Sequence, residues 1–364
     1  MKYIDEYRDR ELVLKLSERI SREISHRWNI MEICGGQTHT ILKYNLQQLL
    51  PEQINLIHGP GCPVCVTPVE MIDRAIELSG KPEVILFTFG DMMRVPGTRG
   101  DLLEAKAMGA DIRMVYSPLD VLEMALALPE KEVVFFAVGF ETTAPAVAMT
   151  VLEASRRNIP NFSVLVSHMR VPPAMEALLD SGLTSIDGFL AAGHVCTVMG
   201  EEEYQSIALD YRIPVVITGF EPVDILYGIL TLTGMLEQGR YAVENAYSRS
   251  VKPEGNTRAK AMLSEVFEPV DRTWRGLGNI AFSGLRLREP YESFNALSRF
   301  RLHESQHDEP QECIAGEILT GRKRPPECPV FGRSCTPEHP IGAPMVSSEG
   351  ACAAYFAYGN TTTD

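Results

Sequence analysis

The sequence predicts an α/β protein with two doubly wound parallel-sheet domains that flank a cleft, followed by a small C-terminal domain. Three observations support this fold class. Short apolar segments alternate with helix-length segments as far as about residue 240, glycine-containing loops follow the apolar segments, and the alternation fades after about residue 270. Strand–helix alternation over this length is typical of parallel sheets covered by crossover helices.

Eight short apolar segments are the predicted strands. They are NIMEI (29–33), INLIH (54–58), EVILFTF (83–89), DIRMVYS (111–117), EVVFFAVGF (132–140), FSVLVSH (162–168), DGFLAAGH (187–194) and PVVITGF (214–220). The first 27 residues have the apolar spacing of an amphipathic helix. The predicted crossover helices lie within 68–79, 118–128, 142–157, 172–181 and 221–238.

Repeated short motifs favour two four-stranded halves over one eight-stranded sheet. The fragment MRVP occurs at 93–96 and again at 169–172, each time shortly after a predicted strand. Phe89-Gly90-Asp91 in the first half has counterparts in Gly139-Phe140-Glu141 and Gly219-Phe220-Glu221 in the second. We therefore expect domains at 1–130 and 131–265 and a cysteine-rich domain at 266–364.

Charge and composition limit the classes of partner. The chain has 364 residues, 45% of them hydrophobic, and a net charge of −14, which argues against nucleic acid or an anionic membrane as the main partner. The charged N-terminus does not have the apolar core of a signal peptide, and no apolar run approaches the ~20 residues of a spanning helix. We expect a cytoplasmic protein, in which eight cysteines serve metal or redox chemistry.

The motif GPGCPVC (59–65) places Cys62 and Cys65 between a predicted strand and a predicted helix. A helix N-terminus lowers the pKa of a nearby thiol and favours the thiolate. The pair could form an inert disulfide or half of a zinc site, although a second CxxC to complete that site is missing from the sequence. A reactive dithiol or a transient metal ligand is the favoured interpretation.

CGGQTH (34–39) follows the first predicted strand, so Cys34 should lie at the same sheet edge as Cys62 and Cys65. His39 lies close by in the sequence, and three thiols with an imidazole suit iron, zinc or copper. A buried structural cysteine is the alternative for Cys34.

In the second half, GFETT (139–143) places Glu141 at a strand end, where a carboxylate could relay protons. The following threonines could equally be helix caps, with Glu141 solvated. His168, His194 and Glu221 are weaker candidates for such a role, and Cys196 has the surroundings of a small buried residue.

The C-terminal segment is poor in apolar residues and holds half of the cysteines. Cys313, Cys328, Cys335 and Cys352 are separated by gaps of fourteen, six and sixteen residues. Four thiolates can hold an iron–sulfur cluster or a zinc ion. The spacing matches neither compact ferredoxin pattern, so the residues alone leave cluster and zinc equally possible.

Together CGGQTH, HGPGCPVC (58–65), GFETT and the widely spaced C-terminal cysteines resemble the HypD family of hydrogenase maturation factors over essentially the whole chain. The resemblance implies two similar α/β domains around a cleft and a smaller domain with a [4Fe–4S] cluster on Cys313, Cys328, Cys335 and Cys352. It also implies assembly of the Fe(CN)2CO group of nickel–iron hydrogenases, with the chaperone HypC as partner and HypE as cyanide donor. The cleft cysteines of the family would be Cys34, Cys62 and Cys65.

One position departs from the family pattern. The first motif is often CGxHxH, whereas this chain has Gln37 in place of the first histidine. A metal-ligand role at Gln37 is therefore in doubt, although an amide could still donate hydrogen bonds. His39 is retained.

The resulting hypothesis is a redox-active assembly scaffold rather than a standard turnover enzyme. Cys62 and Cys65 would exchange electrons with the cluster, and Cys34 would hold transient iron with one of these thiols and a cysteine of the chaperone. His39 and Glu141 would support the ligands or relay protons. An iron–sulfur-dependent thiol–disulfide oxidoreductase, which would not need Cys34, is the alternative, and a structural zinc protein is a third possibility. A radical SAM enzyme is disfavoured because the chain has no CxxxCxxC run.

Overall fold

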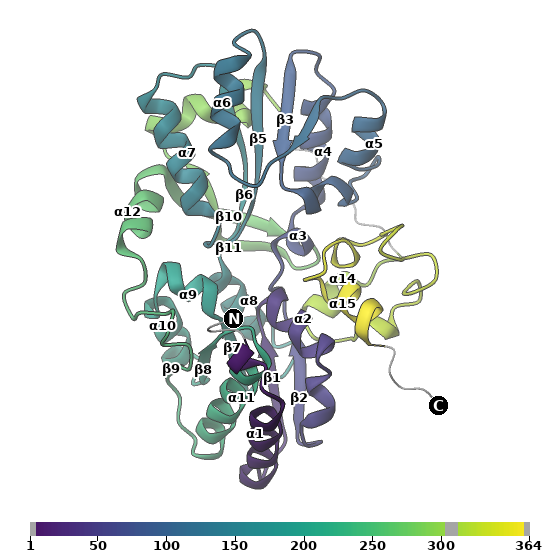
Figure 1. Cartoon of the computed structure of the whole chain (residues 1–364), viewed down its shortest axis with the longest axis vertical. Helices are drawn as coiled ribbons and strands as arrows, with labels where there is room; N and C mark the ends of the chain where they lie inside the picture. The colour runs from purple at the N-terminus through teal and green to yellow at the C-terminus, as the bar shows by residue number, and fades with distance from the viewer. Residues whose placement is uncertain (1–4, 303–311, 360–364) are drawn as a thin grey trace.

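Two parallel β-sheets form the main body of the protein, and a C-terminal segment packs beside them (Figure 1). The computed structural model describes residues 5–302 and 312–359. The larger sheet, sheet A, has the strand order β2-β1-β7-β8-β9, and sheet B has the order β4-β3-β5-β6. Sheet A consists of β1 (Trp28–Glu32), β2 (Ile54–His58), β7 (Gly188–Ala192), β8 (Val215–Thr218) and β9 (Val243–Asn245). Sheet B consists of β3 (Val84–Thr88), β4 (Ile112–Met114), β5 (Glu132–Gly139) and β6 (Phe162–His168).

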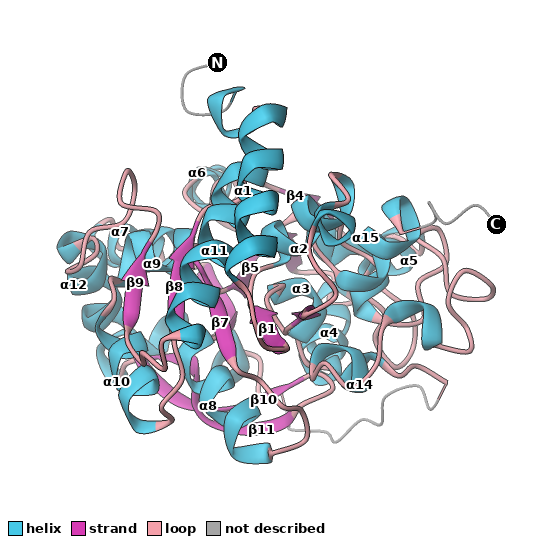
Figure 2. Cartoon of the chain, turned by 90° about the horizontal axis from the view of Figure 1, so that it is seen from below, coloured by secondary structure: helices cyan, strands magenta, loops and turns pink. Residues whose placement is uncertain are grey.

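All eight predicted strands are confirmed, and their apolar character follows from burial on both faces. Every residue of β3, β6, β7 and β8 is buried, because helices cover both sides of each parallel sheet. On sheet A, α1 (Arg10–Glu23) and α11 (Pro222–Glu237) lie on one face, and α8 (Val171–Ser181) and α10 (Glu202–Asp210) lie on the other (Figure 2).

The remaining helices of the α/β region connect the strands or cover sheet B. They are α2 (Gly35–Lys43), α3 (Pro63–Val66), α4 (Val69–Ser79), α5 (Leu102–Ala107), α6 (Asp120–Ala127), α7 (Ala144–Arg156), α9 (Gly193–Met199) and α12 (Thr257–Val266). Proline near the first turn of α3, α7, α8 and α11 suits a position where a backbone N–H has no intrahelical partner. Within the described residues, no helix is long and apolar enough to cross a membrane.

The sheets do not follow the two sequence halves that the motifs favoured. The chain builds β1 and β2 in sheet A, crosses to sheet B for β3 to β6, and returns to sheet A for β7 to β9. A division at residue 130 therefore does not separate the two sheets. The expectation of two consecutive four-stranded sheets is wrong, because hydrogen bonding pairs β1 with β7 and β3 with β5.

Both copies of MRVP follow strands of the same sheet. The first begins next to the end of β3, and the second follows β6 directly. The repeated fragment therefore does not mark equivalent positions in two duplicated sheets.

An antiparallel hairpin, which the sequence analysis did not predict, lies between the two sheets (Figure 1). It consists of β10 (Phe267–Trp274) and β11 (Gly278–Leu287), with a register shift between Val270 and Arg272. The hairpin begins where the regular strand–helix alternation ends.

The C-terminal segment contains only short elements. They are α14 (Ala315–Leu319), η5 (Pro325–Glu327), η6 (Ala343–Met345) and α15 (Ala351–Tyr358). Ala354 and Tyr355 of α15 pack on Leu42 of α2, so this segment lies against the helix that follows Cys34 (Figure 1).

Candidate functional site

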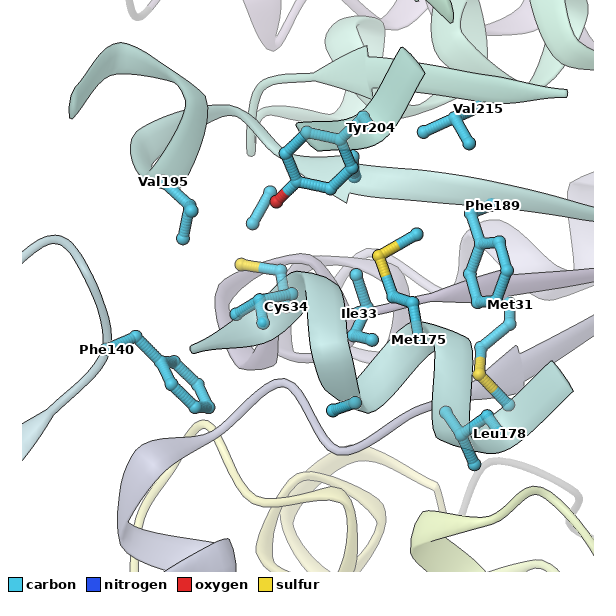
Figure 3. Packing of buried hydrophobic residues seen from close by; sticks show 14 of the residues in the cluster. Met31, Ile33, Cys34, Phe140, Met175, Leu178, Phe189, Val195, Tyr204 and Val215 are labelled. Atoms are coloured by element: carbon cyan, nitrogen blue, oxygen red, sulfur yellow. The ribbon is translucent and has the colours of Figure 1, made fainter. Parts of the chain in front are cut away.

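The predicted site motifs meet between the two sheets. Cys34, Cys62 and Cys65 belong to one buried cluster, which also contains Phe140 from the end of β5 and Val195 from α9. In Figure 3, Cys34 lies at the end of β1, with Val195 and Tyr204 above it and Phe140 below it. This arrangement is consistent with the expectation that the three thiols converge at the carboxyl ends of the strands. Their exposed fractions are 1, 3 and 0%, so packed side chains surround them.

Cys34 is held by the backbone of two loops. It is the N-cap residue of α2, and its N–H donates to Glu32 Oε2 at 2.9 Å. Gly35 N–H donates to Gly61 O at 2.9 Å. A Cβ atom on Gly61 would collide with the Cys34 nitrogen, so glycine is required where the GPGCPVC loop crosses Cys34.

Cys62 and Cys65 form a disulfide, with 5.3 Å between their Cα atoms. The two cysteines span the short helix α3, in which Cys62 is the N-cap and its Sγ accepts the N–H of Cys65 at 3.3 Å. The helical structure after the motif thus begins at Pro63, earlier than the sequence pattern predicted. A bonded pair next to Cys34 is the oxidised form that a redox dithiol would adopt.

His194, a weaker candidate from the sequence, is the imidazole that contacts Cys34. Its Nδ1 lies 3.8 Å from Cys34 Sγ, and its ring stacks on Phe220 with 5.0 Å between centroids. Burial lowers the pKa of His194 to about 4 and raises the pKa of the Cys34 thiol above its ordinary range. The pair is therefore a neutral thiol beside a neutral imidazole at pH 7.

Gln37 has a buried hydrogen-bonding role. Its Nε2 lies 3.2 Å from the carbonyl oxygen of Ala191 and 3.4 Å from those of Thr218 and Gly219. It therefore ties α2 to the ends of β7 and β8. The amide role that the sequence left open agrees with this geometry.

His39 contacts the C-terminal segment. Its Nδ1 lies 3.0 Å from Ser348 O, and its ring meets Tyr358 edge-on. Burial, and next the charge of Asp91, raise the pKa of the neighbouring Glu349, whose backbone packs on Gly35. His39 thus borders the site through Glu349, a residue that sequence reasoning missed.

Glu141 is buried, contrary to the alternative that it is solvated. Its Oε1 accepts the Val171 N–H at 2.9 Å, and its Oε2 has no hydrogen-bond partner among residues 5–302 and 312–359. Burial raises the pKa of Glu141 to about 7. Thr143 is the N-cap of α7, and its Oγ1 lies 3.2 Å from His168 Nε2.

Cys196 is buried in the same cluster, as expected from the sequence. It interacts electrostatically with Glu141 and with Tyr204. The hydroxyl group of Tyr204 is buried beside Cys196. Glu141 therefore lies next to other buried polar side chains and not next to solvent.

The four C-terminal cysteines influence one another. Cys313, Cys335 and Cys328 all contribute, after burial, to the raised pKa of Cys352. Cys335 Sγ accepts the N–H of Ile341 at 3.4 Å, and a Cβ atom on Gly342 would collide with Cys313 Sγ.

The donor set of this segment, four thiols, has the chemistry of an iron–sulfur cluster site. Among the residues that the structure describes, no three His, Cys, Asp or Glu side chains are placed to hold one metal ion. A four-iron cluster needs one thiolate for each of its irons, so its ligands do not have to meet at one point. The all-thiolate donor set, a backbone N–H aimed at a sulfur and a glycine against another sulfur suit such a cluster.

The tip of the hairpin connects the parts of the site. Trp274 stacks on Phe140 with 5.8 Å between centroids. The N–H of Arg275 donates to Val66 O at 2.8 Å, and its guanidinium donates to Pro96 O at 2.9 Å. Gly276 packs directly on the backbone of Gly316, three residues after Cys313.

Comparison with known proteins gives one consistent result. Residues 11–359 match the HypD family model, described as "Hydrogenase formation hypA family". The chain is 48% identical to "Hydrogenase maturation factor HypD2" of Bradyrhizobium diazoefficiens, over 99% of this chain and 97% of the relative. It is 47% identical to "Hydrogenase maturation factor HypD" of Rhodobacter capsulatus (99% and 98%) and 46% identical to the protein of that name in Escherichia coli K12 (98% of each).

Proposed function

The chain belongs to the HypD family, and we propose that it is a hydrogenase maturation factor that holds iron while the diatomic ligands of a nickel–iron site are attached. The observation that carries the proposal is the meeting of Cys34 with the Cys62–Cys65 pair in one buried cluster. Thiolates are suitable ligands for iron and can release it by exchange.

The first step is reduction of the disulfide between Cys62 and Cys65. An external electron donor supplies two electrons, which with two protons convert the disulfide into two thiols. One of these thiols then loses its proton and joins Cys34 as an iron ligand. The third protein ligand would be a cysteine of the chaperone HypC, and HypE would deliver cyanide. The iron with its cyanide and carbonyl ligands is not a resident cofactor of this protein. It is passed on to the next protein in the order of assembly.

Iron binding requires Cys34 to lose its proton, because the thiolate is the ligand. His194 Nδ1, at 3.8 Å, can accept a hydrogen bond from this thiol, but its pKa of about 4 makes it too weak a base to hold the proton near neutral pH. Glu141, with one oxygen unpartnered and a pKa of about 7, can take up or release a proton near neutral pH. His39, through its contact with Ser348 O, supports the backbone that places Glu349 beside Gly35 in this proposal.

Cys313, Cys328, Cys335 and Cys352 would hold a [4Fe–4S] cluster. When bound, it supplies one-electron redox chemistry. Within the chain, α3 and the hairpin tip fix the position of the dithiol relative to Cys313 through Val66, Arg275 and Gly316.

The decisive experiment is iron analysis and infrared spectroscopy of the complex purified with its chaperone. We expect bands from iron-bound cyanide and carbonyl for the wild type and their loss in Cys34→Ala, Cys62→Ala and Cys65→Ala. Cys196→Ala is the matched control, because Cys196 is buried in the same cluster but has no ligand role. It should keep the bands.

The runner-up function is a thiol–disulfide oxidoreductase, which the disulfide itself favours. If Cys34→Ala retains the infrared bands and full hydrogenase maturation, the scaffold proposal is wrong. A complex that carries only the cluster iron would also contradict it.

A further inference from the structure

Two aromatic rings enclose one side of the Cys34 thiol. Cys34 Sγ lies 3.8 Å from His194 Nδ1, and the His194 ring stacks on Phe220 with 5.0 Å between centroids and 30° between the ring planes. A Cβ atom added to Gly36 would lie 3.3 Å from the Phe220 ring and 3.7 Å from Cys34 Sγ. The Phe220 ring and the sulfur therefore pack against the same glycine.

These two rings differ in exposure from the other neighbours of Cys34. The other neighbours are buried, and Figure 3 shows three of them around the thiol: Val195, Tyr204 and Phe140. His194 and Phe220, in contrast, are partly exposed, as is Gly36. Because Cys34 itself is only 1% exposed, a reagent from solvent reaches its sulfur by passing His194 and Phe220.

The ring of Tyr247 supports both of these residues from behind. A Cβ atom added to either Gly193 or Gly219 would lie 2.5 Å from this ring. These two glycines directly precede His194 and Phe220 in the chain. The Tyr247 ring also meets Phe220 edge-on, with 6.0 Å between centroids. Tyr247 therefore sets the spacing of the two loops that carry the stacked rings.

Arg249 holds Tyr247 in place. Its guanidinium lies 4.3 Å from the centroid of the Tyr247 ring and 3.7 Å from that of Tyr7. The same guanidinium donates to both carboxylate oxygens of Asp224, at 2.7 and 2.6 Å. Stacking on aromatic rings combined with bidentate pairing holds an arginine in one geometry. Tyr247 is therefore fixed, and the partly exposed phenylalanine ring in front of it is the part that can turn.

We propose that the stacked pair of His194 and Phe220 is a gate that controls access to Cys34. Rotation of the Phe220 ring away from His194 opens the path by which a soft metal ion or a thiol reagent reaches Cys34 Sγ, and Tyr247 returns the ring to its closed position. Iron as the entering ion rests on the proposed function, whereas the access itself does not.

The test is the rate of Cys34 alkylation in the purified full chain, measured by mass spectrometry of the Cys34 peptide. Two reagents of the same chemistry and different size are used, iodoacetamide and N-phenyliodoacetamide; each forms a sulfur–carbon bond and releases iodide. Phe220→Ala should accelerate the reaction with iodoacetamide about 2- to 12-fold, the factor for ~0.5–1.5 kcal/mol of a stacked aromatic pair. The larger reagent should gain more. Phe220→Tyr, which keeps the ring, should react at the wild-type rate.

The comparison of the two reagents separates access from acidity. Both reagents attack the thiolate, so the ratio of their rates does not depend on the fraction of Cys34 that is ionised. Cys196 is the internal control, because it is buried in the same cluster and unfolding of this region would expose both cysteines. Its alkylation rate should stay unchanged in Phe220→Ala.

An unchanged rate at Cys34, an equal gain for both reagents, or the same gain at Cys196 would overturn the gate. If Phe220→Ala does not fold, Phe220→Leu, which keeps an apolar side chain but no ring, decides by the same criteria. The alkylation needs no iron, so a failed gate is distinguished from a failed scaffold, which is judged by the infrared bands of the wild-type complex.

Discussion

Gln37 and His39 lie two residues apart on α2, but their side chains lie on opposite faces of the helix and contact different parts of the protein. A helix turns about 100° per residue, so residues that are two positions apart lie on nearly opposite faces. Gln37 is buried against the ends of β7 and β8, and His39 contacts Ser348 and Tyr358. The imidazole beside Cys34 is His194, which comes from another element, α9.

Glu141 makes a pH-dependent prediction. Burial raises its pKa to about 7 in the folded protein, above the value of about 4.3 for an unfolded chain. Neutral Glu141 therefore contributes stability that is fully present below pH ~4 and is lost as the pH rises through ~7. In Glu141→Gln this loss is absent, so the unfolding temperature of the variant relative to the wild type should rise between pH 5 and pH 8.

The matched control for this experiment is Glu11→Gln, because Glu11 is exposed on α1. Its difference from the wild type should stay constant over the same pH range. A constant difference for Glu141→Gln as well would show that Glu141 titrates normally and would remove it from the proton-relay proposal.

At the scale of elements, the hairpin decides how the segments of the site fit together. Its tip contacts the CxxC helix through Val66 and the C-terminal segment through Gly316. Gly276 has a φ of +78°, a backbone conformation that costs other residues ~1–2 kcal/mol. A Cβ atom added to Gly276 would lie only 2.8 Å from Gly316 Cα.

We predict that Gly276→Ala is more destabilising than Gly278→Ala. Gly278 has a similar φ of +83°, but an added Cβ atom there meets nothing within 4 Å. Gly278→Ala should therefore lose only the ~1–2 kcal/mol of backbone strain, whereas Gly276→Ala also displaces the C-terminal segment. Thermal unfolding measures the first effect, and limited proteolysis of residues 312–359 measures the second. Equal losses for the two variants would mean that the hairpin tip does not support this segment.

The two MRVP fragments are also explained at this scale. Arg94 donates to Pro337 O and Val346 O in the C-terminal segment, and Arg170 donates to Phe282 O in the hairpin. Both arginines follow strands of sheet B and hold a later segment of the chain against it. The arginine of each repeat therefore makes the same kind of contact, a hydrogen bond to a later segment, and the repeat does not mark two equivalent domains.

At the scale of the whole molecule, the chain crosses between the two sheets twice, and both crossing segments contribute residues to the site. The first crossing contains GPGCPVC, and the second begins with Met169, which belongs to the same buried cluster as Cys34. The C-terminal segment then closes over α2 and α3. Its attachment depends partly on polar contacts, of which the Arg94 hydrogen bonds and the Ser347–Asp91 hydrogen bond at 2.8 Å are the clearest.

Arg94→Ala should therefore loosen the C-terminal segment without unfolding the sheets. Loss of about 1 kcal/mol raises the population of a detached segment ~5-fold. We expect tryptic cleavage within 322–333 to accelerate by about that factor while the unfolding of the α/β region is unchanged. Arg99→Ala, at an exposed position of the same loop, is the control and should be cleaved at the wild-type rate. No difference between the two variants would show that apolar packing alone holds the segment.

The sequence by itself determined the α/β class, eight of the nine strands of the parallel sheets, all but β9, and the motif loops that follow them. These features depend on local apolar periodicity and on glycine and proline at strand ends, which are readable along the chain. The burial of Cys34, Cys62 and Cys65 in one cluster agrees with the expected meeting of the strand ends. The family followed from the same motifs.

The tertiary structure alone decided which strands pair, where the hairpin lies and which side chains surround Cys34. Strand pairing between β1 and β7 joins residues about 160 positions apart, and period-two patterns carry no information about the partner strand. The same holds for the contact of His194 with Cys34. Their contacts arise from long-range packing, whose energy depends on the complete fold rather than on neighbouring residues.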